Sequence, residues 1–254
     1  MKNREIIRFD VIESTSSKAL ALGRQGVATG TVIVAETQTG GRGRMNRNWL
    51  SPPGTGLYFS IILRPVLDPN DLSKITLAAG VAVCKAIELE LGVLPKIKWP
   101  NDLLLDDKKF GGILSETGPV AETAAGHQTL VIVGIGLNIQ EPVGGFPSDL
   151  QITATTLSQH TDTAVVKEDL MLAIADALDK EVALLEKGDF KKILDQWKQR
   201  DGIKDRRLTW VTPKGEKVNG VSLGPDADGM LQVKDGEGKI HTVISGDLSL
   251  FGKD

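Results

Sequence analysis

The order of apolar and polar positions along the chain predicts alternating strands and helices. Apolar runs rich in β-branched residues predict strands within residues 30–40, 56–65 and 129–139, because glycine or proline lies at or near their ends. In residues 71–92, apolar positions recur at helical spacing, which predicts a long helix. Cys84 falls inside that helix, so we expect a buried thiol rather than a nucleophile.

Three further helices are predicted from capping signals and apolar periodicity. A short one covers residues 14–26, where Ser14 or Thr15 is the expected N-cap. Two more cover residues 167–187 and 189–200. The chain therefore mixes helices and strands rather than belonging to an all-α or all-β class.

Turn signals predict a hairpin in the middle of the chain and a separate β unit at its end. Residues 96–118 are expected to form two short strands joined by the turn Asp-Asp-Lys-Lys. The composition changes near residue 205, and the residues that follow alternate in short runs separated by Lys-Gly, Asp-Ala-Asp-Gly and Asp-Gly-Glu-Gly turns. We expect a larger domain over residues 1–205 and a small β-barrel over residues 206–254 that docks on it.

Composition narrows the class of protein. The chain has 254 residues, of which 41% are hydrophobic and 25% charged, which is typical of a globular protein. A net charge of −3 gives no global basic field for nucleic acid or membranes, so a local basic cluster marks a site. A single cysteine excludes an internal disulfide and multi-cysteine metal sites. Without an apolar leader or a span-length apolar run, we expect a cytoplasmic protein.

One basic cluster stands out, the segment GGRGRMNRNW at residues 40–49, with Arg42, Arg44 and Arg47. It could be a solvated loop, an RNA-binding patch or a flexible clamp for phosphates. An RNA patch is disfavoured because only Trp49 accompanies the arginines as an aromatic platform. The chain lacks a P-loop motif, and GIGLNI at residues 134–139 lacks the third glycine of a dinucleotide fingerprint.

Five segments taken together change this picture. STSSK, ETQTGGRGRMNRNW, KWPNDL, KKFGGIL and GIGLN occur in this order, and with them the whole chain resembles the biotin–protein ligase (biotin–acetyl-CoA-carboxylase ligase) family. The resemblance implies an α+β catalytic domain like that of class II aminoacyl-tRNA synthetases, followed by an SH3-like barrel. It also implies that biotin is activated with ATP and Mg²⁺ to biotinyl-5′-AMP, and passed to a lysine of a biotin carboxyl carrier protein.

The expected chemistry explains the cationic loop. A carboxylate must react beside a polyphosphate, so fixed cations are needed to offset repulsion and to stabilise charge on the transferred phosphoryl group. The resemblance implies four catalytic residues: Arg44, Lys98, Asp102 and Lys109. It implies a biotin-binding set of Ser14, Thr15, Ser16, Gln38, Gly41, Arg42, Gly43, Arg44, Lys109 and Gly112. It implies a nucleotide-binding set of Arg47, Trp49, Asn101 and Asn138.

The same residues also admit simpler structural roles. Ser14 and Thr15 are good helix N-caps, Asn138 could cap a turn, and Trp99 before a proline is expected to pack in the core. No protein-only metal site is expected; Mg²⁺ would accompany the ATP phosphates near Asn101 and Asp102.

Two positions depart from the family pattern, which usually has asparagine where this chain has Ser16 and glycine where it has Asn46. Asparagine tolerates a left-handed backbone, so Asn46 is expected to be compatible with the loop. Ser16 keeps a hydroxyl but lacks the amide, which leaves its biotin contact open.

The resemblance begins near residue 9, so we expect a ligase without the N-terminal repressor domain of some members, and no DNA binding. A homodimer is compatible with the family, and the barrel could close over ATP or meet the carrier. The alternatives are a lipoate–protein ligase, whose arginine–glycine signature differs, and a non-catalytic RNA-binding or adaptor protein.

Overall fold

The computed structural model describes residues 4–123, 126–212, 215–244 and 247–250. The first part of the chain builds a seven-stranded sheet in the order β1-β2-β3-β7-β6-β5-β4, in which only β1 and β2 pair in parallel. Its strands are β1 (Ile6–Ile12), β2 (Val32–Gln38), β3 (Gly56–Leu63), β4 (Lys96–Lys98), β5 (Asp102–Leu105), β6 (Lys108–Thr123) and β7 (Gly126–Asn138). The helices are α1 (Thr15–Arg24), α2 (Lys74–Leu91), α3 (Lys167–Glu186) and α4 (Phe190–Gln199), with 3₁₀ turns η1 (Arg44–Asn46), η2 (Pro69–Asp71) and η3 (Leu157–Gln159).

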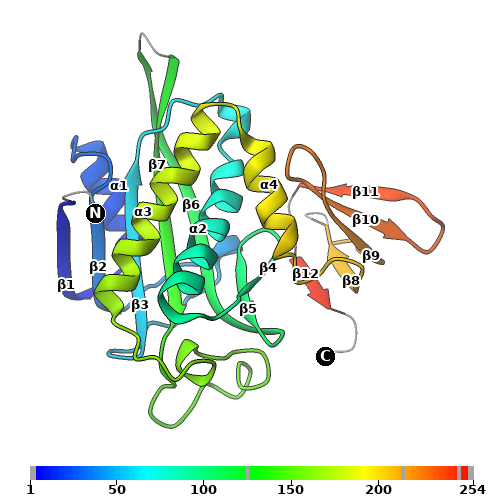
Figure 1. Cartoon of the computed structure of the whole chain (residues 1–254), viewed down its shortest axis with the longest axis horizontal. Helices are drawn as coiled ribbons and strands as arrows, with labels where there is room; N and C mark the ends of the chain where they lie inside the picture. The colour runs from blue at the N-terminus through cyan, green and yellow to red at the C-terminus, as the bar shows by residue number, and fades with distance from the viewer. Residues whose placement is uncertain (1–3, 124–125, 213–214, 245–246, 251–254) are drawn as a thin grey trace.

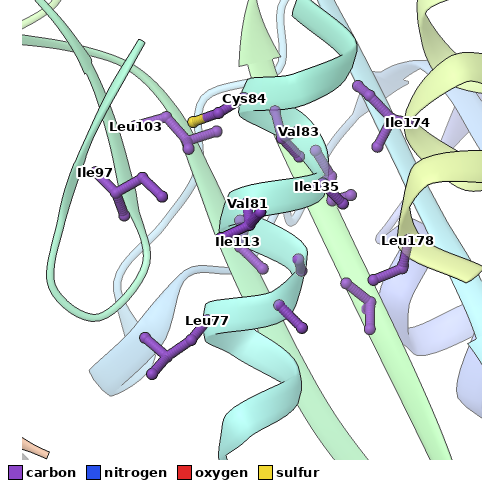
Figure 2. Packing of buried hydrophobic residues seen from close by; sticks show 14 of the residues in the cluster. Leu77, Val81, Val83, Cys84, Ile97, Leu103, Ile113, Ile135, Ile174 and Leu178 are labelled. Carbon is purple, nitrogen blue, oxygen red and sulfur yellow. The ribbon is translucent and has the colours of Figure 1, made fainter. Parts of the chain in front are cut away.

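One face of the sheet is a large apolar core. Phe59 and Ile61 of β3 lie on this face with Val133 and Ile135 of β7, because alternate residues of a strand share a face. Helices α2, α3 and α4 cover it (Figure 1). Figure 2 shows side chains of α2, among them Val81, packed between the sheet and α3. This packing holds the strands in place, and the opposite face of the same strands carries the site described below.

Helix α2 is buried along most of its length because it packs on the sheet between α3 and α4 (Figure 1). It ends where Gly92 takes a left-handed conformation (φ 68°), the usual helix C-terminal signal. Cys84 is fully buried, as predicted, and burial raises the pKa of its thiol to about 12. Within the described ranges, no helix combines the length and apolarity needed to cross a membrane.

The predicted helices are all present, and Ser14 is the N-cap of α1, its side chain accepting a hydrogen bond from the Ser17 N–H. Two strand predictions need correction. The hairpin of residues 96–118 was expected to consist of two short strands, but β6 has 16 residues because it pairs with β7 well beyond that range. Strand β1 was not predicted at all, although Ile6–Ile12 carries apolar and polar residues in near alternation.

A second, five-stranded antiparallel sheet follows α4, in the order β11-β10-β9-β8-β12 (Figure 1). Its strands are β8 (Arg207–Val211), β9 (Lys217–Pro225), β10 (Leu231–Asp235), β11 (Ile240–Val243) and β12 (Asp247–Leu250). Leu208 and Val233 belong to the same apolar cluster as the core of the large sheet. The Trp99 indole also donates a 2.9 Å hydrogen bond to the carbonyl of Gly229. This small β unit is therefore packed on the rest of the chain.

Candidate functional site

A cavity of about 770 Å³ opens on the second face of the seven-stranded sheet. Three glycines explain why the face is hollow: Gly112 pairs with Gly136 across β6 and β7, and Gly134 lies two residues away on the same face. Alongside this hollow, α1 covers the same face of the sheet with a small apolar cluster that includes Ala19 and Ile132. The missing side chains leave room for a ligand directly against the strands.

One end of the cavity is polar and uncharged, and lies at the start of α1. Ser14, Thr15 and Ser16 line it and are 6% exposed or less. The backbone N–H of Thr15 donates to Gln38 Oε1 at 2.9 Å, and the Thr15 hydroxyl donates to the same oxygen at 3.1 Å. The Gln38 amide in turn donates to Ser51 Oγ at 2.9 Å. These groups are held in place before any ligand arrives.

The arginine loop, residues 40–49, folds back on itself beside the cavity. The Gly43 N–H donates to the Arg47 carbonyl at 2.7 Å, and Arg42 forms an isolated bridge with Asn48. Asn46 has a φ of 58° and Met45 a φ of 56°. Asparagine tolerates this left-handed region, which agrees with the expectation that a glycine is not required at position 46.

The loop arginines already have partners from the sheet. Arg42 Nη2 lies 2.5 Å from Glu116 Oε2, and Arg44 Nη1 donates to Asn101 Oδ1 at 3.2 Å. The Asn101 amide in turn donates to the Ile113 carbonyl at 2.9 Å. The loop is therefore tied to β6 and to the segment between β4 and β5.

Opposite charges meet at the mouth of the cavity. Asp102 begins β5 and Lys109 is the second residue of β6, and the Lys109 ammonium lies 2.6 Å from Asp102 Oδ1. The same ammonium lies 5.5 Å from the ring centre of Trp49, within the range of a cation–π contact. Lys98, at the end of β4, also lines the cavity.

Trp49 rests against the glycines of the cavity floor. A Cβ atom at Gly136 would lie 2.6 Å from the Trp49 indole, and one at Gly112 would lie 3.2 Å from it. Asn138, at the end of β7, lines the same region and donates from its amide to the Thr155 carbonyl at 3.2 Å. Asn138 therefore holds the segment just before η3, in addition to lining the cavity itself.

All predicted site residues except Gly41 line this cavity. Gly41 is a buried residue of the arginine loop, and a Cβ atom at this position would come within 2.4 Å of the Trp49 carbonyl. Trp99 is 5% exposed, as predicted for a packing residue, yet it also borders the cavity. The fold therefore places residues from separate segments of the sequence around one cavity.

Other parts of the site were not predicted. Phe146 and Leu150, in the loop after β7, and Leu248 of β12 line the cavity. Glu116 was not singled out either, although it pairs with Arg42. An apolar residue in a loop or a carboxylate on a strand carries no local signal of such a contact, so only the fold reveals it.

Five cationic side chains line the cavity against the single carboxylate of Asp102, so the site favours an anionic ligand. Among the described residues, the cationic side chains that line it are Arg42, Arg44, Arg47, Lys98 and Lys109. Burial raises the pKa of Tyr58, a hydrogen bond with Thr55 opposes that rise, and the Glu36 carboxylate adds to it, so the phenol stays a neutral group. Among the described residues, no three His, Cys, Asp or Glu side chains gather as metal ligands.

Comparison with known proteins identifies the family. Residues 9–138 match the biotin/lipoate A/B protein ligase family. The bifunctional ligase/repressor BirA of Bacillus subtilis (strain 168) is 34% identical over 247 residues, which are 97% of this chain and 74% of that protein. The biotin–[acetyl-CoA-carboxylase] ligase of Mycobacterium tuberculosis is 28% identical over 92% of this chain and 85% of that one.

A solved structure agrees with these matches. The biotin protein ligase from Aquifex aeolicus in complex with biotin and ATP is similar over 97% of this chain and 98% of that chain, with a TM-score of 0.80 and 28% identity. The match extends over both sheets, and the cavity described above lies within the matched part of the chain. This chain belongs to the biotin/lipoate A/B protein ligase family.

Proposed function

We propose that this protein is a biotin–protein ligase, which joins biotin to ATP as biotinyl-5′-AMP and transfers the biotinyl group to a lysine of a biotin carboxyl carrier protein. The observation that carries the proposal is the polarity of the cavity. One end offers the neutral hydrogen-bonding groups of Thr15, Ser16 and Gln38, and the other offers a cluster of arginines and lysines. Biotin has matching ends, a neutral ureido ring and a carboxylate, and the adenylate adds a phosphate to the charged end.

In the first step, a biotin carboxylate oxygen attacks the α-phosphorus of ATP, a new C–O–P link forms, and pyrophosphate leaves as the bond to the β-phosphate breaks. Arg44 and Lys98 would hold the two anions together, and Lys109 would stabilise the negative charge that develops on the phosphoryl oxygens. Arg42, which pairs with Glu116, would supply a further guanidinium beside the carboxylate.

In the second step, the amine of the acceptor lysine attacks the acyl carbon, an amide bond forms, and AMP leaves. The acceptor is an ammonium ion at neutral pH, since an unperturbed lysine has a pKa of about 10.4, and it must lose a proton first. Asp102 Oδ1 already holds one ammonium, that of Lys109, at 2.6 Å. We propose that the Asp102 carboxylate orients the acceptor amine and assists the loss of its proton.

Asp102 and Asn101 fit a magnesium ion that arrives with ATP. Their carboxylate and amide oxygens are hard ligands of the kind Mg²⁺ takes, and together they would hold it beside the phosphates. When bound, the ion supplies neutralisation of the triphosphate charge. Since Asn101 Oδ1 accepts from Arg44, this arrangement also ties the metal position to the arginine loop.

For the nucleotide, we propose that Trp49 stacks on the adenine and that Asn138 contacts it. Trp49 lies against the glycine floor with one edge near Gly136, and Asn138 follows on the same strand. Arg47 lies on the same loop as Trp49 and lines the cavity, which suits a contact with the nucleotide phosphates.

We further propose that residues 1–205 form a catalytic domain of the class II aminoacyl-tRNA-synthetase type and residues 206–254 an SH3-like domain. The mainly antiparallel sheet of seven strands backed by helices supports the first assignment, and the five short antiparallel strands β8–β12 support the second. Leu248 of β12 lines the cavity, which favours a role for the small domain in closing over the substrates.

A lipoate–protein ligase is disfavoured by the neutral end of the cavity. Lipoate ends in a dithiolane, which has no N–H donor, so the polar groups at this end would meet an apolar ring that makes no hydrogen bond to them. The Mycobacterium tuberculosis relative and the Aquifex aeolicus structure reported above are named as biotin ligases. An RNA-binding or adaptor role gives no purpose to the pairing of Asp102 with Lys109 at the mouth of the cavity.

Biotin-dependent exchange of pyrophosphate into ATP tests the proposal, because exchange requires reversible adenylate formation. We expect exchange with biotin and none with lipoate, and loss of exchange in Lys109→Met, which keeps the stem of the side chain without its charge. Lys108→Met, an exposed neighbour on the same strand, is the matched control and should exchange normally. Exchange that depends on lipoate, or on neither acid, would contradict the proposal.

The acceptor and the assembly belong to the proposal as well. We expect the carrier domain of a biotin-dependent carboxylase to be the acceptor, a homodimer to be compatible with activity, and DNA not to be a ligand. The net charge of −3 supports the last point. A gel shift that survives nonspecific competitor DNA at moderate salt would contradict it.

A further inference from the structure

The long loop after β7 supplies a short extended segment beside Lys109. The Lys109 N–H donates to the Thr153 carbonyl at 2.7 Å, and the Thr155 N–H donates to the Lys109 carbonyl at 3.0 Å. Lys109 and Ala154 thereby form an isolated parallel bridge. Both backbone polar groups of Lys109 are held by this segment, so its position sets where the Lys109 side chain starts.

Thr155 holds a second residue of the site as well. The Asn138 amide donates to the Thr155 carbonyl at 3.2 Å. Lys109 and Asn138 both line the cavity, whereas Thr155 is 3% exposed and is not among the lining residues. Thr155 can therefore affect a ligand only through these two neighbours, which come from different strands.

The side chain of Thr155 has partners of its own, and the direction of each bond can be worked out. Gln159 Nε2 donates to Glu141 Oε2 at 3.1 Å, which leaves the Gln159 carbonyl oxygen for Thr155. The Thr155 hydroxyl donates to that oxygen at 2.8 Å, and this bond uses its only proton. His160 Nε2 lies 2.9 Å from the same hydroxyl, so the imidazole must be the donor in that bond.

This hydroxyl therefore anchors the segment at one point. Gln159 and His160 lie at the end of the 3₁₀ turn η3, which follows Thr155 directly in the chain. Without the hydroxyl, an amide oxygen and an imidazole N–H would both lose their partner, and the turn would have to rearrange to satisfy them. The peptide that holds Lys109 and Asn138 would move with it.

We infer that Thr155 is a positioning residue for adenylate formation, because its hydroxyl fixes the segment that holds the Lys109 backbone and the Asn138 amide. The inference rests on the proposed function, in which Lys109 meets the transferred phosphoryl group and Asn138 the nucleotide. Among the described residues, no hydrogen bond joins Thr155 to the neutral end of the cavity at the start of α1. A shift of the segment should therefore disturb the phosphates and the nucleotide but not biotin.

The test is Thr155→Val in biotin-dependent exchange of pyrophosphate into ATP, since valine keeps the shape of threonine without its hydroxyl. The kcat should fall by about 10- to 100-fold, the loss that a displacement of about 1 Å causes at a reacting centre. The KM for ATP should rise by about 3- to 10-fold, the equivalent of one hydrogen bond, and the KM for biotin should not change. Thr155→Ser, which restores the hydroxyl, should return both values close to those of the wild type.

Thr156→Val is the matched control. Thr156 is the next residue of the same segment, is fully buried, and has its Oγ1 3.2 Å from Ser158 Oγ. This variant also loses a buried hydroxyl and should lose a similar amount of thermal stability, but it should keep the wild-type kcat and KM values. A purely structural role for Thr155 predicts the same kinetics for both valine variants.

A double-mutant cycle shows whether Thr155 acts through Asn138. Thr155→Val should raise the KM for ATP in the wild-type background and add little to it in the Asn138→Ala background, because both changes remove the same contact. His160→Phe, which removes only the donor to the Thr155 hydroxyl, should shift kcat and the KM for ATP in the same direction and serves if Thr155→Val does not fold.

Three results would overturn the inference: wild-type kinetics in Thr155→Val and His160→Phe, an equal loss of kcat in Thr155→Val and Thr156→Val, or full additivity of Thr155→Val with Asn138→Ala. Failure of the wild-type protein to catalyse biotin-dependent exchange would instead overturn the proposed function.

Discussion

Alanine at Gly134 and alanine at Gly136 should impair opposite ends of the cavity. The two glycines lie two residues apart on the same face of β7. A Cβ atom at Gly134 would lie 2.4 Å from Ser16 Oγ, and one at Gly136 would lie 2.6 Å from Trp49 Nε1 and Cε2. Neither distance is tolerable, so in each variant a different neighbour must move.

The sizes of the two effects follow from what moves. In Gly134→Ala, the Ser16 hydroxyl is displaced and loses its bond to Ser60 and its contact with the ligand, each contributing about 0.5 to 1.5 kcal/mol. In Gly136→Ala, Trp49 is pushed off the floor, and stacking of an aromatic side chain on a base contributes about 1 to 3 kcal/mol. Each variant therefore loses about 1 to 3 kcal/mol, which corresponds to a roughly 5- to 150-fold rise in the KM of the substrate affected.

The measurement is steady-state biotinyl-5′-AMP synthesis, with biotin and ATP varied in turn. Gly134→Ala should raise the KM for biotin by this factor and leave the KM for ATP nearly unchanged, and Gly136→Ala should do the reverse. Neither glycine has a left-handed backbone, so alanine is compatible with both strands. The loss of thermal stability in Gly134→Ala should be that of one buried hydrogen bond, about 0.5 to 1.5 kcal/mol. Gly236→Ala, where a Cβ atom would meet nothing within 4 Å, is the control.

The reasoning is refuted if both variants raise the same KM, or if the two effects are exchanged. A loss of folded protein in either variant would be visible as a fall in Tm and would separate misfolding from a local effect on the cavity.

Three further predictions concern the mouth of the cavity, the arginine loop and the junction with the second sheet. Asp102→Ala should slow transfer from preformed biotinyl-5′-AMP to the carrier lysine by about 10²- to 10⁴-fold in rapid-quench assays; normal transfer with impaired pyrophosphate exchange would assign Asp102 to the metal instead. Biotin with Mg-ATP should protect Arg42, Arg44 and Arg47 from trypsin far more than ATP alone, as peptide mapping would show, and equal cleavage with and without adenylate would contradict a clamp. Burial raises the pKa of Asp201, and the hydrogen bonds from the Ile203 and Lys204 N–H groups oppose the shift. The folded protein therefore binds this proton more tightly than the unfolded chain does. Stability should be highest below the pKa of the unfolded chain and should fall as the pH rises through the pKa of the folded protein. Asp201→Asn keeps the acceptor for both N–H groups, and its Tm advantage over wild type should be largest near pH 7 and shrink toward about pH 4; an advantage independent of pH would count against this account.

The sequence by itself determined the elements whose signals are local. Ser14 marks the start of α1 and Gly92 marks the end of α2, and the spacing of apolar residues predicts α2 and α3. These signals are legible in the sequence because capping and periodicity depend on neighbours a few residues apart. The arginine loop was also legible, since three arginines among glycines have no role in packing. Its expected chemistry came from the resemblance of five segments taken together.

Elements stabilised by distant partners were decided by the tertiary structure. Strand β1 has only β2 as its partner and no strong apolar run, and β6 is long because β7 pairs with it over many residues. The same holds within the site: Glu116 meets Arg42 across 74 positions of sequence, and Leu248 reaches the cavity from the second sheet. Contacts of this kind leave no local pattern.

Ser60 shows the difference most clearly. In sequence it is one serine inside an apolar strand, and its surroundings give it no function. The fold brings it within hydrogen-bond distance of Thr15 and Ser16 on another element and buries all three. Because a buried hydroxyl must satisfy its proton and lone pairs locally, the tertiary structure fixes the direction of each bond, and the sequence alone could only supply the hydroxyls.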